Sequence, residues 1–221
     1  MLRPARKQPL VRLPTPPLLV ISDRRQARRP LDELAEEIFA GGCRWFSLRE
    51  KDLPAAERRA LLGALVTLGR RWEATVAVHE DIDAAVMAAA GGVHLPSGGS
   101  PRTARARLPG GLIGASAHSA EEAAALLRSG ADYVTVSPVF ATASKPDYGP
   151  AIGLDGLAEI TARVSGPVIA LGGITAETAL LCLAAGAYGV AVMGEAMRAP
   201  HPRATVEAIL DAMSDSERAN K

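Results

Sequence analysis

The segment whose residue types point most clearly to ligand binding runs from Ser137 to Gly153, between two apolar runs. Near its middle, two hydroxyl side chains and the one cation of the segment lie close together, at Thr142, Ser144 and Lys145. Hydroxyl groups donate hydrogen bonds and a lysine adds positive charge, a combination that suits a phosphate. A compact domain rarely keeps so long an irregular connection unless the segment binds a ligand or moves. The segment therefore predicts a phosphate-binding loop.

Two glycine turns further along the chain could supply the rest of such a site. Gly172-Gly173 and Met193-Gly194 each follow an apolar run and precede a helical pattern. Glycine at the start of a helix exposes backbone N–H groups, which bind phosphate together with the helix dipole. A tight turn between strand and helix is the competing explanation for the paired glycines.

Charged and titratable side chains also follow apolar runs. Arg49-Glu50-Lys51 is either an anion-binding group or a solvated charge run. His118 stands just before a predicted helix cap, and histidine exchanges a proton near neutral pH. We predict a functional role for His118. His94 lies within an apolar run, where a core or supporting histidine is the usual explanation, and His201 between prolines is predicted to be a surface residue.

The elements that must position these residues are eight short apolar runs that alternate with helical patterns. The runs are residues 18–22, 44–48, 75–78, 93–95, 112–115, 132–136, 168–171 and 189–192. Such alternation predicts a parallel sheet covered by helices, hence an α/β protein. No G-x-G-x-x-G follows the first run, so a single (β/α)8 TIM barrel is favoured over a doubly wound sheet. In such barrels the site lies at the carboxyl ends of the strands.

Composition limits the function classes. Of 221 residues, 48% are hydrophobic and only 4% aromatic, so the core must be built from Ala, Val, Leu and Ile. A net charge of +1 argues against nucleic acid or an anionic membrane as the main partner. Two cysteines, no membrane-length apolar run and no signal-peptide pattern indicate a cytoplasmic protein. We expect a flexible N-terminal extension over 1–17, a barrel domain over 18–213 and a polar tail over 214–221.

Several motifs, in order from about residue 18 to residue 198, resemble the thiamin phosphate synthase and thiazole tautomerase superfamily. They are Arg49-Glu-Lys51, Gly92-Val-His-Leu95, Phe140-Ala-Thr-Ala-Ser-Lys-Pro146, Ile169-Ala-Leu-Gly-Gly-Ile174 and Gly186-Ala-Tyr-Gly-Val-Ala-Val192. The resemblance implies a (β/α)8 barrel that acts on a phosphorylated thiazole in thiamin biosynthesis. It also implies that the thiazole phosphate binds to Thr142, Ser144, Lys145, Gly172, Gly173, Met193 and Gly194.

The residues that the synthase reaction implies are incomplete. Synthases of the family carry Gln two residues before the Arg of Arg-Glu-Lys, where this chain has Ser47, and Asn-Asp where this chain has His79-Glu80. They also place a magnesium-binding aspartate after the fourth strand, where this chain reads Pro96-Ser-Gly-Gly-Ser100. Mg²⁺ neutralises the departing diphosphate. A synthase would therefore have Glu80 as its metal ligand.

The segments Leu95-Pro-Ser-Gly98 and Ser116-Ala-His-Ser119 resemble the tautomerase branch, which uses a histidine at the position of His118 and needs no metal. We therefore predict a metal-independent thiazole tautomerase, with His118, Lys51 and Arg49 as its catalytic residues. The segment Thr142-Ala-Ser-Lys-Pro146 is closer to the synthase branch. A synthase that joins hydroxymethylpyrimidine diphosphate to thiazole phosphate, with Mg²⁺, is therefore the main competing hypothesis.

The motifs are also compatible with two less specific functions. One is a non-catalytic protein that binds thiazole or thiamin phosphate, and the second is a phosphosugar isomerase barrel. The sequence also leaves open whether the chain acts as a monomer or as a homodimer.

Overall fold

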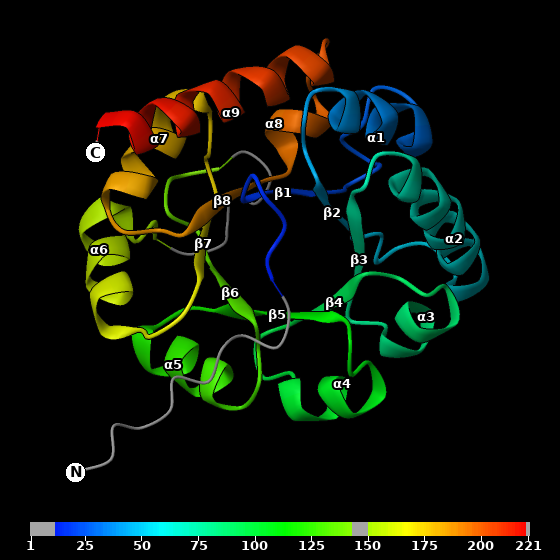
Figure 1. Cartoon of the computed structure of the whole chain (residues 1–221), viewed down its shortest axis with the longest axis horizontal. Coiled ribbons are helices and arrows are strands. Elements are labelled where there is room, and N and C mark those ends of the chain that lie inside the picture. The colour runs from blue at the N-terminus through cyan, green and yellow to red at the C-terminus, as the bar shows by residue number, and fades with distance from the viewer. Residues whose placement is uncertain (1–11, 143–149, 220–221) are drawn as a thin grey trace.

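A computed structural model shows eight parallel strands in a closed barrel, each paired with the next in sequence and β8 paired with β1 (Figure 1). The structure describes residues 12–142 and 150–219, with side chains to residue 214. Helices surround the barrel on the outside (Figure 1). The predicted (β/α)8 barrel is thus confirmed.

The strands lie close to the predicted apolar runs. They are β1 Leu18–Ile21, β2 Trp45–Leu48, β3 Thr75–His79, β4 Gly92–Leu95, β5 Leu112–Ala117, β6 Tyr133–Val136, β7 Val168–Leu171 and β8 Gly189–Val192. The helices are α1 Leu31–Ala40, α2 Ala55–Arg71, α3 Ile82–Met87, α4 Pro101–Arg107, α5 Ala120–Arg128, α6 Gly153–Arg163, α7 Ala176–Ala184, α8 Gly194–Met197 and α9 Pro202–Ala219.

Side-chain alternation along the strands divides the core into two layers. One layer fills the barrel and the second packs between strands and helices. The inner cluster consists of Leu19, Ile21, Trp45, Leu112, Tyr133, Ile169 and Ala191. Within it, the rings of Trp45 and Tyr133 meet edge to face at 4.6 Å. The inside of the barrel is therefore a packed core, and a ligand must bind at one of its ends.

Helix caps begin several helices at the edge of the barrel. Ser119 Oγ accepts a hydrogen bond from Glu122 N–H at 3.1 Å, so the cap predicted for α5 is present. Asp81 caps α3 and Ser100 caps α4 in the same way. Thr175 and Thr178 form a reciprocal capping box at the start of α7. These caps fix where each loop after a strand turns into its helix.

The chain ends depart from the expected boundaries. Residues 12–17, expected to belong to a flexible extension, contact the barrel: Leu13 packs against the inner cluster, and Pro17 O accepts from Val190 N–H at 3.1 Å. In Figure 1 this dark blue segment crosses the middle of the barrel before β1. At the carboxyl terminus, α9 continues to Ala219, beyond residue 214, where we expected a polar tail to begin.

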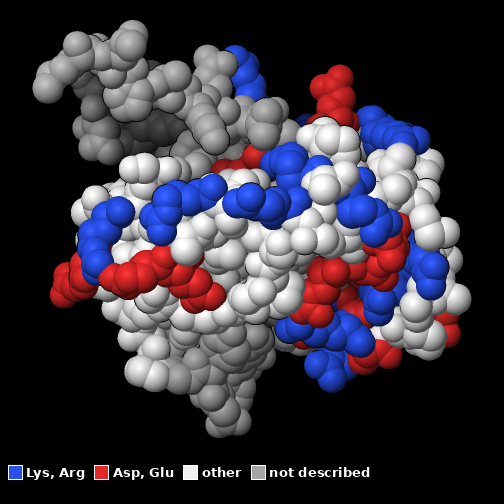
Figure 2. Space-filling model, turned by 90° about the horizontal axis from the view of Figure 1, so that it is seen from below, with Lys and Arg blue, Asp and Glu red and all other residues white. Residues whose placement is uncertain are grey.

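The surface mixes both signs of charge. On the face shown in Figure 2, acidic side chains lie beside basic ones, and a band of basic side chains crosses part of the surface. Exposed ion pairs such as Arg163–Glu121 and Arg107–Asp83 join neighbouring helices. Within the described residues, no helix combines the length and the apolar character that crossing a membrane requires.

Candidate active site

A cavity of about 360 Å³ opens at the carboxyl ends of the strands. Every predicted site residue that the structure describes contributes to its lining. These residues are Arg49, Lys51, Glu80, His118, Thr142, Gly172, Gly173, Met193 and Gly194. Ser144 and Lys145 lie outside the described residues. Residues that follow several different strands are thereby brought to one place, as the barrel topology requires.

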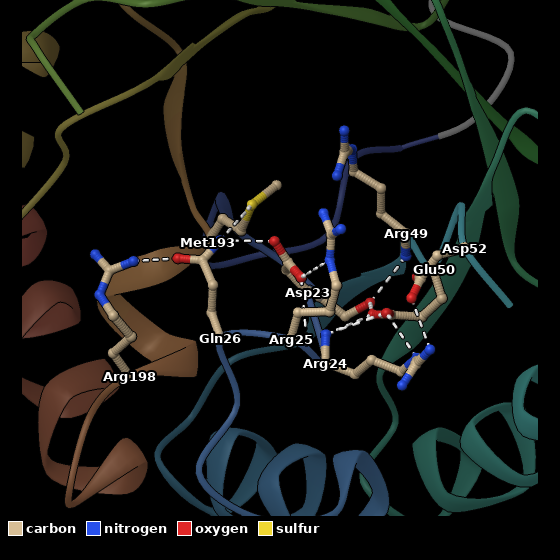
Figure 3. A network of polar contacts seen from close by, with 10 residues as sticks. Asp23, Arg24, Arg25, Gln26, Arg49, Glu50, Asp52, Met193 and Arg198 are labelled. Carbon is tan, nitrogen blue, oxygen red and sulfur yellow. Dashed lines mark hydrogen bonds and ion pairs between the residues drawn. The ribbon is translucent and has the colours of Figure 1, made fainter. Parts of the chain in front are cut away.

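The Arg49-Glu50-Lys51 segment follows β2, and its middle residue is buried. Glu50 is only 2% exposed and accepts hydrogen bonds from Ser22 Oγ–H at 2.6 Å and from Arg24 N–H at 3.1 Å (Figure 3). Ser22 Oγ in turn accepts from Arg49 N–H at 2.8 Å. Burial raises the pKa of Glu50. The segment is therefore no solvated charge run: Glu50 anchors it, while Arg49 and Lys51 line the cavity.

The turn after β3 places a carboxylate beside these cations. Glu80 adopts a left-handed backbone conformation, with φ of 67°, and its carboxylate pairs with the Lys51 ammonium. Among the described residues, no group of three or more His, Cys, Asp or Glu could hold a metal ion. Proteins often hold Mg²⁺ through one or two carboxylates with substrate phosphates and water. Glu80 fits such a site, in which the substrate supplies the remaining oxygens.

His94 is buried inside the barrel, where we expected a core or supporting histidine, and it also contributes to the lining of the cavity. Its Nδ1 lies 3.1 Å from Tyr133 Oη, and its Nε2 lies 3.0 Å from Ser116 Oγ and 3.3 Å from Thr135 Oγ1. The His79 ring lies 4.6 Å from the His94 ring. Burial, followed by the charge of Arg49, lowers the pKa of His94 to about 3. His94 is therefore a neutral ring that orients its hydroxyl partners, of which Ser116 lines the cavity.

His118 is exposed at the cavity wall, as a proton-transferring residue would need to be. Its Nδ1 lies 3.3 Å from Ser137 O, and its backbone N–H donates to Glu122 Oε2 at 2.8 Å. The ring is thus held beside the start of the loop after β6. This contact joins the predicted base to the predicted phosphate loop.

The predicted phosphate end brings that loop against the turn after β7. Val139 N–H donates to Leu171 O at 2.9 Å, and Phe140 N–H donates to Gly172 O at 3.0 Å. Gly172 and Gly173 have φ of 100° and 66°, and a Cβ on Gly173 would lie 2.6 Å from Phe140 Cβ. Only glycine fits there without strain. The glycines therefore serve the tight turn and line the cavity as well.

The helix dipole contributes unequally at the two glycine turns. α7 is a capped helix of 9 residues, whereas α8, which begins at Gly194, has only 4. One helical turn carries little dipole. The dipole at Met193-Gly194 is therefore weaker than we expected from sequence, and weaker than the dipole behind Gly172-Gly173, although both turns line the cavity.

Three functional positions are not evident from sequence. Ser116 lines the cavity two residues before His118, so the period-two alternation of a longer β5 would have revealed it. Glu50 stands out in the sequence only as part of a charged motif. Arg198, directly after α8, lines the cavity as well, and a lone arginine there gives no sequence signal.

Fold and cavity define a (β/α)8 protein whose cavity, at the carboxyl ends of its strands, is lined by cations and glycine turns. The chain belongs to the thiamine monophosphate synthase family, whose model matches residues 18–196. It is 42% identical over 196 residues to a putative thiamine-phosphate synthase of Geobacter sulfurreducens, covering 87% of this chain and 92% of the relative. It is 40% identical over 195 residues to the thiamine-phosphate synthase of Roseiflexus castenholzii, covering 87% and 86%.

A solved structure agrees with these relatives. The thiamine phosphate pyrophosphorylase from Pyrococcus furiosus matches with a TM-score of 0.82 and 33% identity, over 90% of this chain and 96% of that one. The chain is therefore an enzyme of thiamin biosynthesis, as the sequence motifs implied. Because the relatives carry synthase names, the comparisons favour the synthase over the tautomerase that we predicted first from the motifs.

Proposed function

We propose that this enzyme is a thiamine-phosphate synthase, which joins hydroxymethylpyrimidine diphosphate to thiazole phosphate and releases diphosphate. One observation carries the proposal beyond the family: the cavity has two separate ends suited to anions. Arg49 and Lys51 stand after β2, and the glycine turns with Thr142 stand after β6, β7 and β8. Both ends are then occupied by phosphate groups, and the two cations after β2 suit a diphosphate, which carries more negative charge than the single carboxylate that a tautomerase would place there.

The two ends divide the work of the reaction. The bond between the methylene carbon of the pyrimidine substrate and the diphosphate oxygen breaks, and the thiazole nitrogen forms a bond to that carbon. Negative charge therefore builds on the departing diphosphate. Arg49 and Lys51, held by the buried Glu50 junction, stabilise that charge because their positions are fixed in advance. At the opposite end Gly172, Gly173, Gly194 and Thr142 hold the thiazole phosphate, and Ser144 and Lys145 belong to the same proposed set.

Magnesium fits the diphosphate end. Glu80 would hold Mg²⁺ together with oxygens of the bound diphosphate, and when bound the ion supplies charge neutralisation to the leaving group. Lys51 is paired with Glu80 before substrate binds, and its ammonium would then contact the diphosphate as well as the Glu80 carboxylate.

A second candidate function remains the thiazole tautomerase. The observation that favours it is His118, whose exposed ring lines the cavity. The loop after β4, Pro96 to Ser100, also contains no carboxylate. In that reaction His118 would move one proton, and Arg49 and Lys51 would bind the substrate carboxylate.

An assay with both substrate sets separates the two reactions. Purified enzyme is given hydroxymethylpyrimidine diphosphate and thiazole phosphate, with Mg²⁺ or with EDTA, and thiamin phosphate is measured. We expect product with Mg²⁺ only. Lys51→Ala and Arg49→Ala should each lower kcat/KM by about 100-fold, as losses of preorganised charge do. Arg71→Ala, an exposed residue of α2 paired with Glu36, is the matched control and should leave kcat/KM unchanged.

The outcome for His118 completes the test. A synthase should retain most of its activity in His118→Ala. If saturating Mg²⁺ gives no thiamin phosphate, and aromatisation of the thiazole carboxylate phosphate depends on His118, the synthase proposal is rejected in favour of the tautomerase. Binding of thiazole phosphate without turnover in either assay would reject both.

A further inference from the structure

One cation at the phosphate end of the cavity belongs to no predicted motif. The described Lys and Arg residues that line the cavity are Arg49, Lys51 and Arg198. The first two follow β2. Arg198 follows α8, on the side of Met193 and Gly194, and its side chain is exposed. The exposed carboxylate of Glu195 also lines this end. An anion bound there therefore needs a positive charge in addition to neutral N–H donors.

A short chain of contacts holds the Arg198 side chain toward the loop after β1. Arg198 Nη1–H donates to Gln26 Oε1, and Gln26 Nε2–H donates to Asp23 Oδ2 at 2.6 Å (Figure 3). Gln26 Nε2 also lies 3.9 Å from Met193 Sδ. Asp23 is only 9% exposed, so the far end of the chain is fixed in the barrel edge.

The chemistry of Gln26 matters for the charge of its partner. An amide oxygen orients a guanidinium without cancelling its charge, because the amide is neutral. A planar guanidinium presents paired N–H donors that match two phosphate oxygens.

We propose that Arg198, positioned by Gln26, is a further phosphate-binding residue that makes the enzyme select the phosphorylated thiazole over the same thiazole without phosphate. The inference rests on the proposed function for the identity of the ligand. Backbone N–H groups of the glycine turns and the Arg198 fork then hold the phosphate from two sides. The loop after β1 thereby contributes to specificity without touching the substrate.

Equilibrium binding tests this assignment without turnover. Calorimetry measures the affinity of the wild type and of Arg198→Ala for thiazole phosphate and for the unphosphorylated thiazole. We expect Arg198→Ala to weaken phosphate binding by about 10- to 100-fold, the usual loss for a charged hydrogen bond, and to leave binding of the unphosphorylated thiazole unchanged. Arg198→Lys should lie between the two, because lysine keeps the charge and loses the fork.

Gln26→Ala tests the positioning role. It should weaken thiazole phosphate binding less than Arg198→Ala does, and in turnover both variants should raise KM for thiazole phosphate with little change in kcat. Arg203→Ala removes an exposed arginine of α9 that pairs with Glu207 and is the matched control. Equal affinity of Arg198→Ala and the wild type for thiazole phosphate would overturn the assignment, as would an equal loss for both thiazoles.

The two proposals can fail separately. If the wild type makes no thiamin phosphate but its preference for the phosphorylated thiazole depends on Arg198, the synthase proposal fails and this inference stands. If thiamin phosphate forms and Arg198→Ala keeps the wild-type KM for thiazole phosphate, the inference fails and the synthase stands.

Discussion

His94 lies inside the barrel, where its ring contacts side chains from β3, β5 and β6. Its neutral form is fitted to these hydroxyl partners, and burial excludes its charged form. The native pKa of about 3 lies below the ordinary 6.5. The unfolded chain therefore takes up a proton on this side chain at a pH where the folded chain does not, and folding stability must depend on pH.

The sign of that dependence can be measured. The contribution of His94 is fully present above about pH 6.5 and is lost as the pH falls toward 3. Between pH 7 and pH 5 the wild type should lose about 2 kcal/mol of unfolding free energy through this group. His94→Gln keeps polar atoms but does not titrate. Between pH 7 and pH 5 the unfolding free energy of this variant should therefore fall by about 2 kcal/mol less than that of the wild type. Urea unfolding at both pH values decides the matter; parallel losses in both proteins would contradict the assigned pKa.

The residues that sequence predicted differ from those it missed in how their roles arise. Arg49, Lys51, His118 and the glycine turns follow strand ends, so barrel topology alone brings them together. Glu50 and Arg198 act through contacts with the loop after β1, among them Ser22–Glu50 and Gln26–Arg198. Those contacts join residues 28 and 172 positions apart in the sequence. No local pattern specifies such a pair, because each contact depends on the final packing of two loops.

At the scale of elements, the turn after β7 depends on glycine for its shape. A Cβ on Gly173 would lie 2.7 Å from Ala141 O, a backbone atom that cannot move aside cheaply. Gly173→Ala should therefore destabilise the protein by about 1–3 kcal/mol, the usual range for strain at such a site, and should raise KM for thiazole phosphate. Thermal or urea unfolding and steady-state kinetics measure the two effects.

Gly63 gives the matched control. It lies inside α2 with nothing within 4 Å of an added Cβ. Gly63→Ala should stabilise the protein by about 0.5–1 kcal/mol, because alanine loses less backbone entropy in a helix, and should leave KM unchanged. If both glycine variants behaved alike, the importance of glycine for the shape of the β7 turn would be disproved.

Element boundaries show where sequence reasoning works and where it stops. β7 and β8 have the predicted bounds, because Pro167 and Gly172 flank the first apolar run and Gly189 begins the second. β5 extends past the predicted end at Ala115 to Ala117. Ser116 looks like a loop residue in the sequence, yet its hydroxyl has a partner inside the barrel in His94. α8, the helix expected after Met193-Gly194, has only four residues, too few for a periodic pattern to predict its length.

At the scale of the whole molecule, the two ends of the barrel differ in role: one holds the cavity, and the other is covered by the segment before β1. The cavity occupies the carboxyl ends of the strands, and residues 12–17 lead into the amino end of β1. Leu13→Ala should lower the unfolding free energy by about 1–2 kcal/mol, a reduced cost because Leu13 is only partly buried. KM and kcat should stay at wild-type values. A change in KM of Leu13→Ala without a loss of stability would instead show that the amino end of the barrel is coupled to the cavity.

The contact made by Leu13 could not be predicted from sequence, since five prolines and four cations in the first 17 residues are typical of an unstructured extension. The packing of Leu13 becomes favourable only once the closed barrel offers an apolar end to cover. The barrel itself was predictable, because its alternation of strands and helices repeats along the whole chain.

The loop after β1 serves both ends of the cavity at once: its first residue, Ser22, fixes Arg49, and Gln26 fixes Arg198. Surface loops usually tolerate insertions and deletions. Here the number of residues between Ser22 and Gln26 is constrained. One added or removed residue would break the contact to Arg49 or the contact to Arg198. Among relatives with both side chains, the length of this loop should therefore vary less than its composition.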